Sequence, residues 1–274
     1  MRIYNEILSQ YTEIEIPVKR IVSLSSGLTE ALYMMGLGDL IVGTDAFSNK
    51  PTEARRKAKV GSYTHVNIEL LKSLEPDIIF TITGVQRGII EILRREGLTV
   101  YPLPMPTDVA GIIANTSLLG YATGYIDKAR GLVSRLYRGL LKIIEDSGRR
   151  TLSILVVLDF GPRGGLWSPG GASHISDAIH LLGGISITGE KPVSYIETRE
   201  AIAGVDAIDL VIYENSSYIT SEEPIGYNKM LEMLRAGGVR YKKAIAFQEE
   251  VLAHTGPSFI LDSMQRLRRI FDEL

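Results

Sequence analysis

The chain has 274 residues, of which 45% are hydrophobic and 23% are charged. That composition excludes wholesale disorder and allows one large domain or two of roughly 130 residues each. The 30 basic and 32 acidic residues leave a net charge of -2, which argues against a protein that binds nucleic acid by neutralising phosphates. Because cysteine is absent, disulfides, thiolate catalysis and cysteine-ligated metal clusters are excluded.

The first twenty residues mix charged and apolar side chains and contain no small-residue cleavage site, so they do not resemble a secretory leader. No apolar run approaches the roughly 18–20 residues that a membrane-spanning helix needs. We therefore expect no membrane span in this chain. The protein is either cytosolic or the mature part of an exported protein.

Short, β-branched apolar runs alternate along the chain with segments of helical periodicity. Continuous apolar strands between helices predict parallel sheets that are covered on both faces, and hence an α/β fold. The expected strands are Arg20–Ser25, Leu40–Thr44, Asp77–Ile82 and Leu98–Leu103 in the first half, and Thr151–Leu158, Asp209–Glu214 and Lys243–Phe247 in the second.

A long helix is predicted between these halves, over Gly124–Ser147. Its apolar residues recur at spacings of three and four, which marks one helical face. A helix of this length is a stiff connector, and we expect an N-terminal lobe over residues 1–122, a connecting helix over 123–148 and a C-terminal lobe over 149–274. The apolar face consists of Ile126, Ala129, Leu132, Val133, Leu136, Leu140 and Ile143.

Two segments of the first half are echoed in the second, in the same order. Thr29–Gly36 and Ser176–Gly183 each read as a hydroxyl residue, an acid, an apolar helix and a terminating glycine. Asn67–Phe80 and Thr198–Ile212 each give a helix with an early acid, followed by an Asp that opens an apolar strand. These echoes favour two similarly built lobes, with chance similarity between α/β segments as the alternative.

Common enzyme signatures are absent, since the chain contains neither a GxxxxGK[ST] phosphate loop nor a GxSxG nucleophile elbow. The glycine-rich segment Gly161–Gly171 leads into a helix expected near Ser173 and could hold an anion there. We favour instead a flexible loop at the rim of a ligand site, because Trp167 in its middle suits stacking better than phosphate binding.

Three of the four histidines, His65, His174 and His254, fall in expected loops or helix starts after strands. Ligands of doubly wound sheets lie at that edge, so a shared metal site is conceivable. No HxH or HxxxH spacing supports it, and the alternative is solvated or capping histidines. The metal content is therefore left unknown.

Four aromatic residues, Phe47, Tyr63, Trp167 and Tyr195, lie outside the expected strands. A ring in a loop has no core to fill, so it is either a stacking platform or ordinary surface. We interpret the set as the lining of a ligand site.

Glu69 and Glu200 occupy matching places at the start of the two echoed helices. An acid near a helix N-terminus compensates the helix dipole and contributes about 0.3–1 kcal/mol. That effect explains either acid alone, but not why each lobe presents an equivalent one.

Taken in order, these motifs resemble the cobalamin and ferric-siderophore substrate-binding proteins of ABC importers, the periplasmic binding proteins of class III. The resemblance extends from Arg20 to the C-terminus, and its most specific parts are a Thr-Glu pair at the first helix and an Asn-x-Glu motif followed by Glu75-Pro-Asp77. It is carried by Arg20–Leu32, Val42–Asp45, Lys59–Ser62, Asn67–Ile79, Ser173–Gly184 and Thr198–Ile212.

The resemblance implies two Rossmann-like lobes with mainly parallel sheets, joined by one long rigid helix, and a bulky metal-containing ligand in the cleft between them. It implies a binding protein, not an enzyme, that docks onto a membrane permease and its ATPase through Glu69 and Glu200. It also implies an extracytoplasmic location, periplasmic or at the cell surface. We expect a monomer.

The ligand stays open among a corrinoid such as cobalamin, haem and a ferric siderophore. Cobalamin binders of the family favour tryptophan where this chain has Tyr63. Haem binders place a tyrosine or histidine on the iron, for which Tyr63 or His65 would serve, and siderophore binders use arginines and tryptophans. The expected ligand-binding residues are Phe47, Tyr63, His65, Arg163, Trp167, Tyr195 and His254.

Three other functions are kept as alternatives. The chain could be a cytosolic corrinoid or haem carrier, or a small-metal-ion binder that uses His65, His174 and His254. It could also be a transferase-type enzyme on a related two-lobed fold, in which case Gly161–Gly171 would have to contact nucleotide phosphates.

Overall fold

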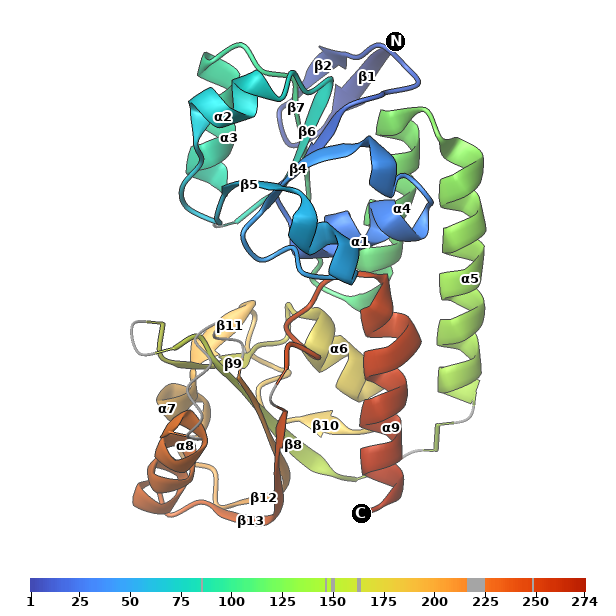
Figure 1. Cartoon of the computed structure of the whole chain (residues 1–274). Helices are drawn as coiled ribbons and strands as arrows, with labels where there is room; N and C mark the ends of the chain where they lie inside the picture. The colour runs from blue at the N-terminus through green and yellow to red at the C-terminus, as the bar shows by residue number, and fades with distance from the viewer. Residues whose placement is uncertain (85, 146, 149–150, 162–163, 216–224, 248) are drawn as a thin grey trace. The chain divides into compact units, whose positions relative to one another are not determined.

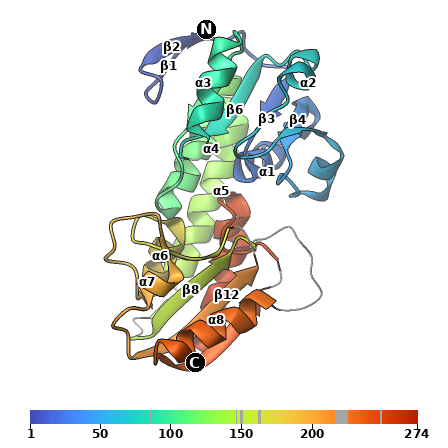
Figure 2. The same ribbon diagram turned by 90° about the vertical axis from the view of Figure 1, so that its left-hand side faces the viewer.

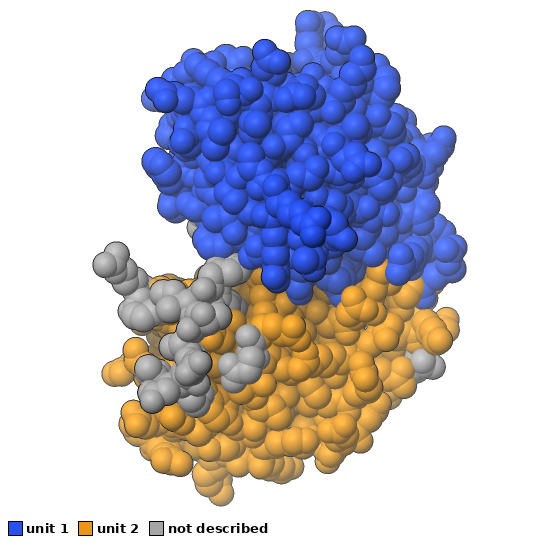
Figure 3. Space-filling model, in the orientation of Figure 1, with its two compact units in different colours: residues 1–106, 110–138, 255–258 blue, residues 107–109, 139–254, 259–274 orange. Residues whose placement is uncertain are grey.

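The computed structural model describes residues 1–274 apart from 85, 146, 149–150, 162–163, 216–224 and 248. It divides into two compact units (Figure 3). The long helix α5 (Ile126–Glu145) contributes to both, and the division falls between Arg138 and Gly139. At 1.5 Å per residue this helix is about 30 Å long, which confirms the predicted connector. Unit 1 comprises residues 1–106, 110–138 and 255–258, and unit 2 comprises residues 107–109, 139–254 and 259–274.

Unit 1 is built on a five-stranded, fully parallel sheet in the order β5-β4-β3-β6-β7 (Figure 1). Helices α2 and α3 pack on one face, and α1 and α4 lie on the other. A separate antiparallel hairpin, β1 (Arg2–Asn5) with β2 (Gln10–Glu13), precedes the sheet. The remaining bounds are β3 Ile21–Ser23, β4 Ile41–Asp45, β5 Ala58–Gly61, β6 Ile78–Ile82, β7 Val100–Leu103, α1 Ser26–Met34, α2 Ile68–Ser73, α3 Arg87–Arg95 and α4 Val109–Thr123, with 3-10 turns at Gly38–Leu40 and Thr52–Arg56.

Unit 2 is built on a sheet in the order β11-β9-β8-β12-β13, to which β10 adds beside β8. Strands β8, β10, β12 and β13 are parallel, β9 is antiparallel to β8, and β11 is antiparallel to β9. Helices α7 and α8 cover one face and α6 and α9 the other (Figures 1 and 2). The bounds are β8 Ser153–Asp159, β9 Leu166–Pro169, β10 Ile185–Ser186, β11 Tyr195–Glu197, β12 Ala207–Asn215, β13 Arg240–Phe247, α6 His174–Leu181, α7 Thr198–Ala201, α8 Ile225–Ala236 and α9 Met264–Asp272, with a π-helical turn at Phe259–Ser263 before α9.

Each sheet has apolar side chains on both faces, as the sequence predicts for parallel strands. In unit 2 the run Ile154–Leu158 is fully buried. Leu155 and Val157 pack with Met230 and Leu234 of α8, which accounts for the helix on that face. The α/β fold class with mainly parallel sheets is therefore confirmed.

The first internal echo is confirmed as an echo of structure. Helices α1 and α6 are each followed by a glycine in the left-handed region, Gly36 at φ +70° and Gly183 at φ +83°. The matching acids of the two helices also have the same role, which is to accept a hydrogen bond from a backbone N–H that is distant in the sequence. Glu30 accepts a hydrogen bond from the backbone N–H of Ser258 (2.9 Å), and Asp177 accepts one from the backbone N–H of Val109 (2.8 Å).

The second echo is confirmed by two aspartates that hold neighbouring strands in register. Asp77, just before β6, accepts a hydrogen bond from the backbone N–H of Arg20 (2.8 Å), and Asp209 in β12 accepts one from that of Ser153 (2.7 Å). The Lys242 ammonium nitrogen lies 2.6 Å from a carboxylate oxygen of Asp209. The hydrogen bond from Lys242, followed by that from Ser153, lowers the pKa of Asp209 to about 2.

One expectation about local structure is wrong. The glycine-rich segment Gly161–Gly171 is not an open loop, because Leu166–Pro169 forms β9, which pairs with both β8 and β11. Trp167 therefore stands in a strand, and Tyr195 opens β11. Just before β9, the N–H of Gly165 donates to the carbonyl of Gly161 (2.9 Å).

Candidate functional site

Strand order locates the functional edge of each unit separately. In unit 1 the chain winds from β3 outward through β4 and β5, and then from β6 through β7 on the other side. Ligands of such sheets bind at the carboxyl ends of the strands, near the point where the order reverses. At that point Gln86 is fully buried, accepts a hydrogen bond from the N–H of Ile82 (2.9 Å) and donates to the carbonyl of Leu24 (2.6 Å).

Phe47 and Tyr63 meet at this edge, after β4 and β5 respectively. Their rings are stacked, with centroids 4.7 Å apart and planes inclined by 19°, and both side chains are half-buried. The two turns that carry them are also tied together, because the N–H of Ala46 donates to the carbonyl of Gly61 (2.7 Å). The sequence proposed both residues as ligand contacts, and the structure makes them one aromatic platform.

His65 closes the turn that carries Tyr63, where its carbonyl accepts a hydrogen bond from the N–H of Ser62 (2.7 Å). The residue is exposed. Among the residues that the structure describes, no three His, Asp or Glu side chains are grouped so that they could hold a metal ion.

In unit 2, Trp167 and Tyr195 share one face of the antiparallel pair β9–β11. Tyr195 is paired with Pro169 and Trp167 with Glu197, and side chains two residues apart on a strand point to the same side. The Trp167 indole N–H donates to the carbonyl of Gly164 (2.6 Å), which fixes the ring. Both side chains are half-buried.

Phe160 also stands at this edge, although the sequence did not indicate it. It follows β8 at the carboxyl edge, its side chain is 41% exposed, and its ring packs edge-to-face against Tyr195 with centroids 6.3 Å apart. In this sheet the strand order reverses between β8 and β12. The rule that places ligands at such a reversal would have singled out the residue just after β8.

The surroundings of Tyr195 are acidic. Glu214, at the end of β12, is fully buried and accepts backbone hydrogen bonds from Val251, Leu252 and Ala253 at 3.0, 2.5 and 2.9 Å. Burial, followed by the carboxylates of Glu214 and Glu250, raises the pKa of Tyr195 to about 12. The Tyr195 phenol is therefore a neutral hydrogen-bonding group throughout the physiological range.

Two predicted ligand contacts gain no support from their positions. His254 is only 1% exposed and lies beside His174. Burial, reinforced by the neighbouring His254, lowers the pKa of His174 to about 4, against the opposing effect of its 2.9 Å hydrogen bond to the carbonyl of Leu252. His254 therefore belongs to a buried part of unit 2, and Arg163 lies outside the described residues.

Glu69 and Glu200 stand where the sequence places them, in the first turns of α2 and α7, and both are exposed. Asn67 caps α2 by accepting a hydrogen bond from the N–H of Leu70 (3.0 Å). Glu69 itself is an exposed carboxylate in this first turn.

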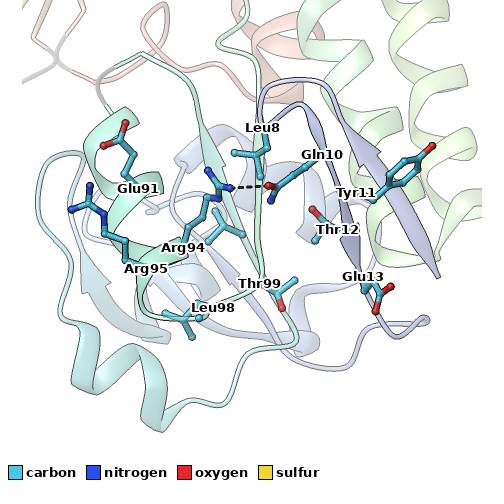
Figure 4. Close-up of a pocket in the computed structure, with 12 residues that line it drawn as sticks. Leu8, Gln10, Tyr11, Thr12, Glu13, Glu91, Arg94, Arg95, Leu98 and Thr99 are labelled. Atoms are coloured by element: carbon cyan, nitrogen blue, oxygen red, sulfur yellow. Dashed lines mark hydrogen bonds between the residues drawn. The ribbon is translucent and has the colours of Figure 1, made fainter.

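A groove on unit 1 does not involve any of these residues (Figure 4). It has a volume of about 830 Å³ and is lined by β2, the end of α3 and the start of β7. Arg94 donates a hydrogen bond to Gln10 across it (2.8 Å). The groove is open and polar, and it lies away from the carboxyl edge of the sheet.

Comparison with known proteins identifies the family. Residues 21–236 match the family model described as periplasmic binding protein. The chain belongs to the periplasmic binding protein family. The matched segment includes every predicted contact residue except His254, which lies beyond its end.

Two relatives of this periplasmic binding protein are informative. The uncharacterized ABC transporter substrate-binding lipoprotein YvrC of Bacillus subtilis (strain 168) is 23% identical over 249 residues, covering 88% of this chain and 76% of the relative. The vitamin B12-binding protein of Yersinia pestis (strain Pestoides F) is 27% identical over 187 residues, covering 67% of this chain. That second match spans 65% of the relative's length.

Solved structures of other periplasmic binding proteins share the fold. The vitamin B12 binding protein BtuF of Vibrio cholerae superposes with a TM-score of 0.70 at 18% identity, covering 93% of this chain and 97% of that one. The heme-binding protein RhuT of Roseiflexus sp. RS-1 gives a TM-score of 0.77 at 16% identity, covering 93% and 98%. The fold of two α/β lobes joined by a long helix is thus a known one. No helix of the described residues is long and apolar enough to cross a membrane.

Proposed function

We propose that this protein is the substrate-binding component of an ABC importer, which captures a bulky metal-containing ligand and delivers it to a membrane permease. The observation that carries the proposal is the family match over residues 21–236. The site chemistry is consistent with it, since the carboxyl ends of both sheets carry aromatic rings. No nucleophile–base pair is needed for such a task, because specificity comes from shape and a few polar groups.

The ligand class follows from the rings. Phe47 and Tyr63 offer a flat aromatic surface, and Phe160, Trp167 and Tyr195 offer apolar ring edges with the Tyr195 hydroxyl as a polar tip. Such surfaces suit a large planar or ring-shaped chelate: a corrinoid, haem or an aromatic ferric siderophore. Relatives named for vitamin B12 and heme support the same range.

Absorption-monitored titration with hydroxocobalamin, haemin and a ferric siderophore tests this proposal. We expect at least one to bind with a Kd below about 100 µM, which corresponds to about -5.5 kcal/mol. Failure of all three would reject the ligand class. A shift of the haemin Soret band that is lost in Tyr63→Phe, but kept in His65→Ala, would assign the phenol to the iron.

Docking on the permease is proposed to use Glu69 and Glu200, the exposed acids that open α2 and α7. Opposite charges on a permease would orient the complex more than they add affinity. In vesicles that contain the permease and its ATPase, Glu69→Ala and Glu200→Ala should reduce uptake while leaving ligand affinity unchanged. The exposed Glu91 and Glu232 provide matched controls, and equal losses in Glu91→Ala and Glu232→Ala would refute the assignment.

The same proposal places the protein outside the cytoplasm as a monomer. Its relatives include a lipoprotein and periplasmic proteins by name. Fractionation of cells that express the full gene should recover the protein at the surface or in the periplasm. Sedimentation should give a single species near the mass of one chain.

A further inference from the structure

A buried polar cluster lies directly beneath the Phe47–Tyr63 platform. Its centre is Asp45, the last residue of β4, whose side chain is fully buried. One carboxylate oxygen accepts a hydrogen bond from the backbone N–H of Phe47 (2.6 Å), and the other accepts one from the hydroxyl of Ser48 (2.7 Å). Asp45 therefore closes the turn that presents the Phe47 ring.

The turn is anchored from two further elements. The Lys59 ammonium, on β5, donates to the carbonyl of Ser48 (2.8 Å) and to the hydroxyl of Thr44 (3.0 Å). Thr29, from α1, shares a hydrogen bond with the Ser48 hydroxyl (2.8 Å). The residues that follow Phe47 are thus held by a helix and by the strand that leads to Tyr63.

Placing the charges of Asp45 and Lys59 away from water costs free energy that an apolar core would not. Burial raises the pKa of Asp45 and lowers that of Lys59, and each charge partly offsets the shift of the other. Buried charges of this kind are often no more stabilising than apolar residues of similar volume. What they provide is a fixed geometry for the backbone they bind.

We infer that Asp45 is a positioning residue that holds Phe47 in its stacked geometry on Tyr63 and thereby preorganises the platform for a flat ligand. The part of this inference that concerns affinity rests on the proposed function. Asp45 does not contact the ligand itself. Its effect passes through the Phe47 backbone, and a platform that is already stacked loses less conformational freedom when the ligand binds.

The geometric claim is tested on the ligand-free protein. The ring current of Phe47 shifts the NMR signals of the Tyr63 ring protons. These signals are identified among those of the 13 tyrosines because they disappear in Tyr63→Phe. Phe47→Leu defines the unstacked position of these signals. Asp45→Ala should move them at least half-way towards it, whereas Asp45→Asn should leave them nearly in place, because an amide oxygen can still accept from the Phe47 N–H.

Asp39→Ala is the matched control, since it removes an exposed carboxylate of the same unit. If Asp45→Ala does not fold, Asp45→Leu replaces it, because leucine fills the space without offering an acceptor. Unmoved Tyr63 signals in the folded Asp45 variant, or equal movement in Asp39→Ala, would overturn the inference.

A double-mutant cycle tests the effect on affinity, using whichever of hydroxocobalamin, haemin and the ferric siderophore binds the wild type. We expect Asp45→Ala to weaken binding about tenfold in the wild type, and by less than about twofold when Phe47 is already alanine. Equal losses in both backgrounds would show general damage and overturn the positioning role. If no probe binds the wild type, the proposed function fails, and the tyrosine signals alone decide whether Asp45 holds the stack.

Discussion

The sharpest stability prediction concerns Glu214, whose carboxylate holds the segment after β13 through three backbone hydrogen bonds. Glu214→Ala removes the acceptor for all three N–H groups at once. Each buried donor left without a partner costs about 1–3 kcal/mol. Water entering the vacated space recovers part of that, so we expect a loss of about 3–5 kcal/mol in the free energy of unfolding.

The assay separates unit 2 from the rest of the chain. Trp167 is the only tryptophan and lies in unit 2, so its fluorescence during urea unfolding reports on that unit. Far-ultraviolet circular dichroism reports on both units. Glu214→Ala should move the fluorescence transition to lower urea, while the part of the dichroism signal that belongs to unit 1 stays in place.

Glu249→Ala is the control, because Glu249 is an exposed acid of the same region whose ion pair with Arg266 spans 3.0 Å. An exposed pair of this kind contributes about 0–1 kcal/mol. If Glu214→Ala cost no more than this control, the three hydrogen bonds would not stabilise unit 2, and the reasoning from buried donors would be wrong.

Three further predictions follow from single contacts. Phe160→Ala should weaken ligand binding about tenfold in the titration, whereas Tyr121→Ala, which truncates a ring that is 46% exposed on α4, should not change it; equal affinities would remove Phe160 from the site. Gly61→Ala should lower the thermal midpoint by several degrees, since a methyl group there would collide with the carbonyl of His65; an unchanged midpoint would show that the turn adapts freely. Asp209, whose pKa of about 2 lies below the ordinary 3.8, contributes stability above about pH 4 that is lost as the pH falls towards 2. Asp209→Asn should therefore cost about 1 kcal/mol at pH 7, discounted for solvent screening, and almost nothing near pH 2; a difference independent of pH would contradict this.

Much of the fold could be predicted because its strongest signals are local. The continuous apolar run Ile154–Leu158 predicts a strand that is buried on both faces, as is typical of an α/β chain. The apolar stripe of α5 is equally direct, since Ala129, Leu132, Leu136 and Ile143 are buried as the helical spacing requires. These elements depend on which residues are apolar, and the sequence shows that openly.

The missed strands depend on partners that the sequence does not display. Strand β2 is Gln10–Glu13, a polar segment that is extended only because it pairs with β1. The glycines around β9 suggest a loop, yet the pairing of Trp167 with Glu197 and Leu158 makes the segment a strand. For short polar or glycine-flanked strands, tertiary pairing overrides local propensity.

The candidate site was predicted unevenly for a related reason. Phe47 follows a strand that the sequence indicates, so its place at the sheet edge could be inferred, whereas Tyr63 follows β5, a strand that was not predicted. Phe160 could be recognised only with the strand order known, since a phenylalanine after a buried run reads as core. His254 lies outside the helices and strands, as predicted, but it is buried beside His174, and burial of a polar residue in a loop is not visible in the sequence.

The pleat of β9 and β11 gives this strand pair two faces with different surroundings. Trp167 and Tyr195 share one side, whereas Ser168 points the other way, where its hydroxyl pairs with that of the buried Thr198 (3.1 Å). On the proposed function, substitutions at Trp167 and Tyr195 are expected to alter which ligands bind, whereas substitutions at Ser168 or Thr198 are expected to disturb the interior. A one-residue insertion in either strand would turn the side chains beyond it to the opposite face, so that the ring face and the buried face would both be disrupted.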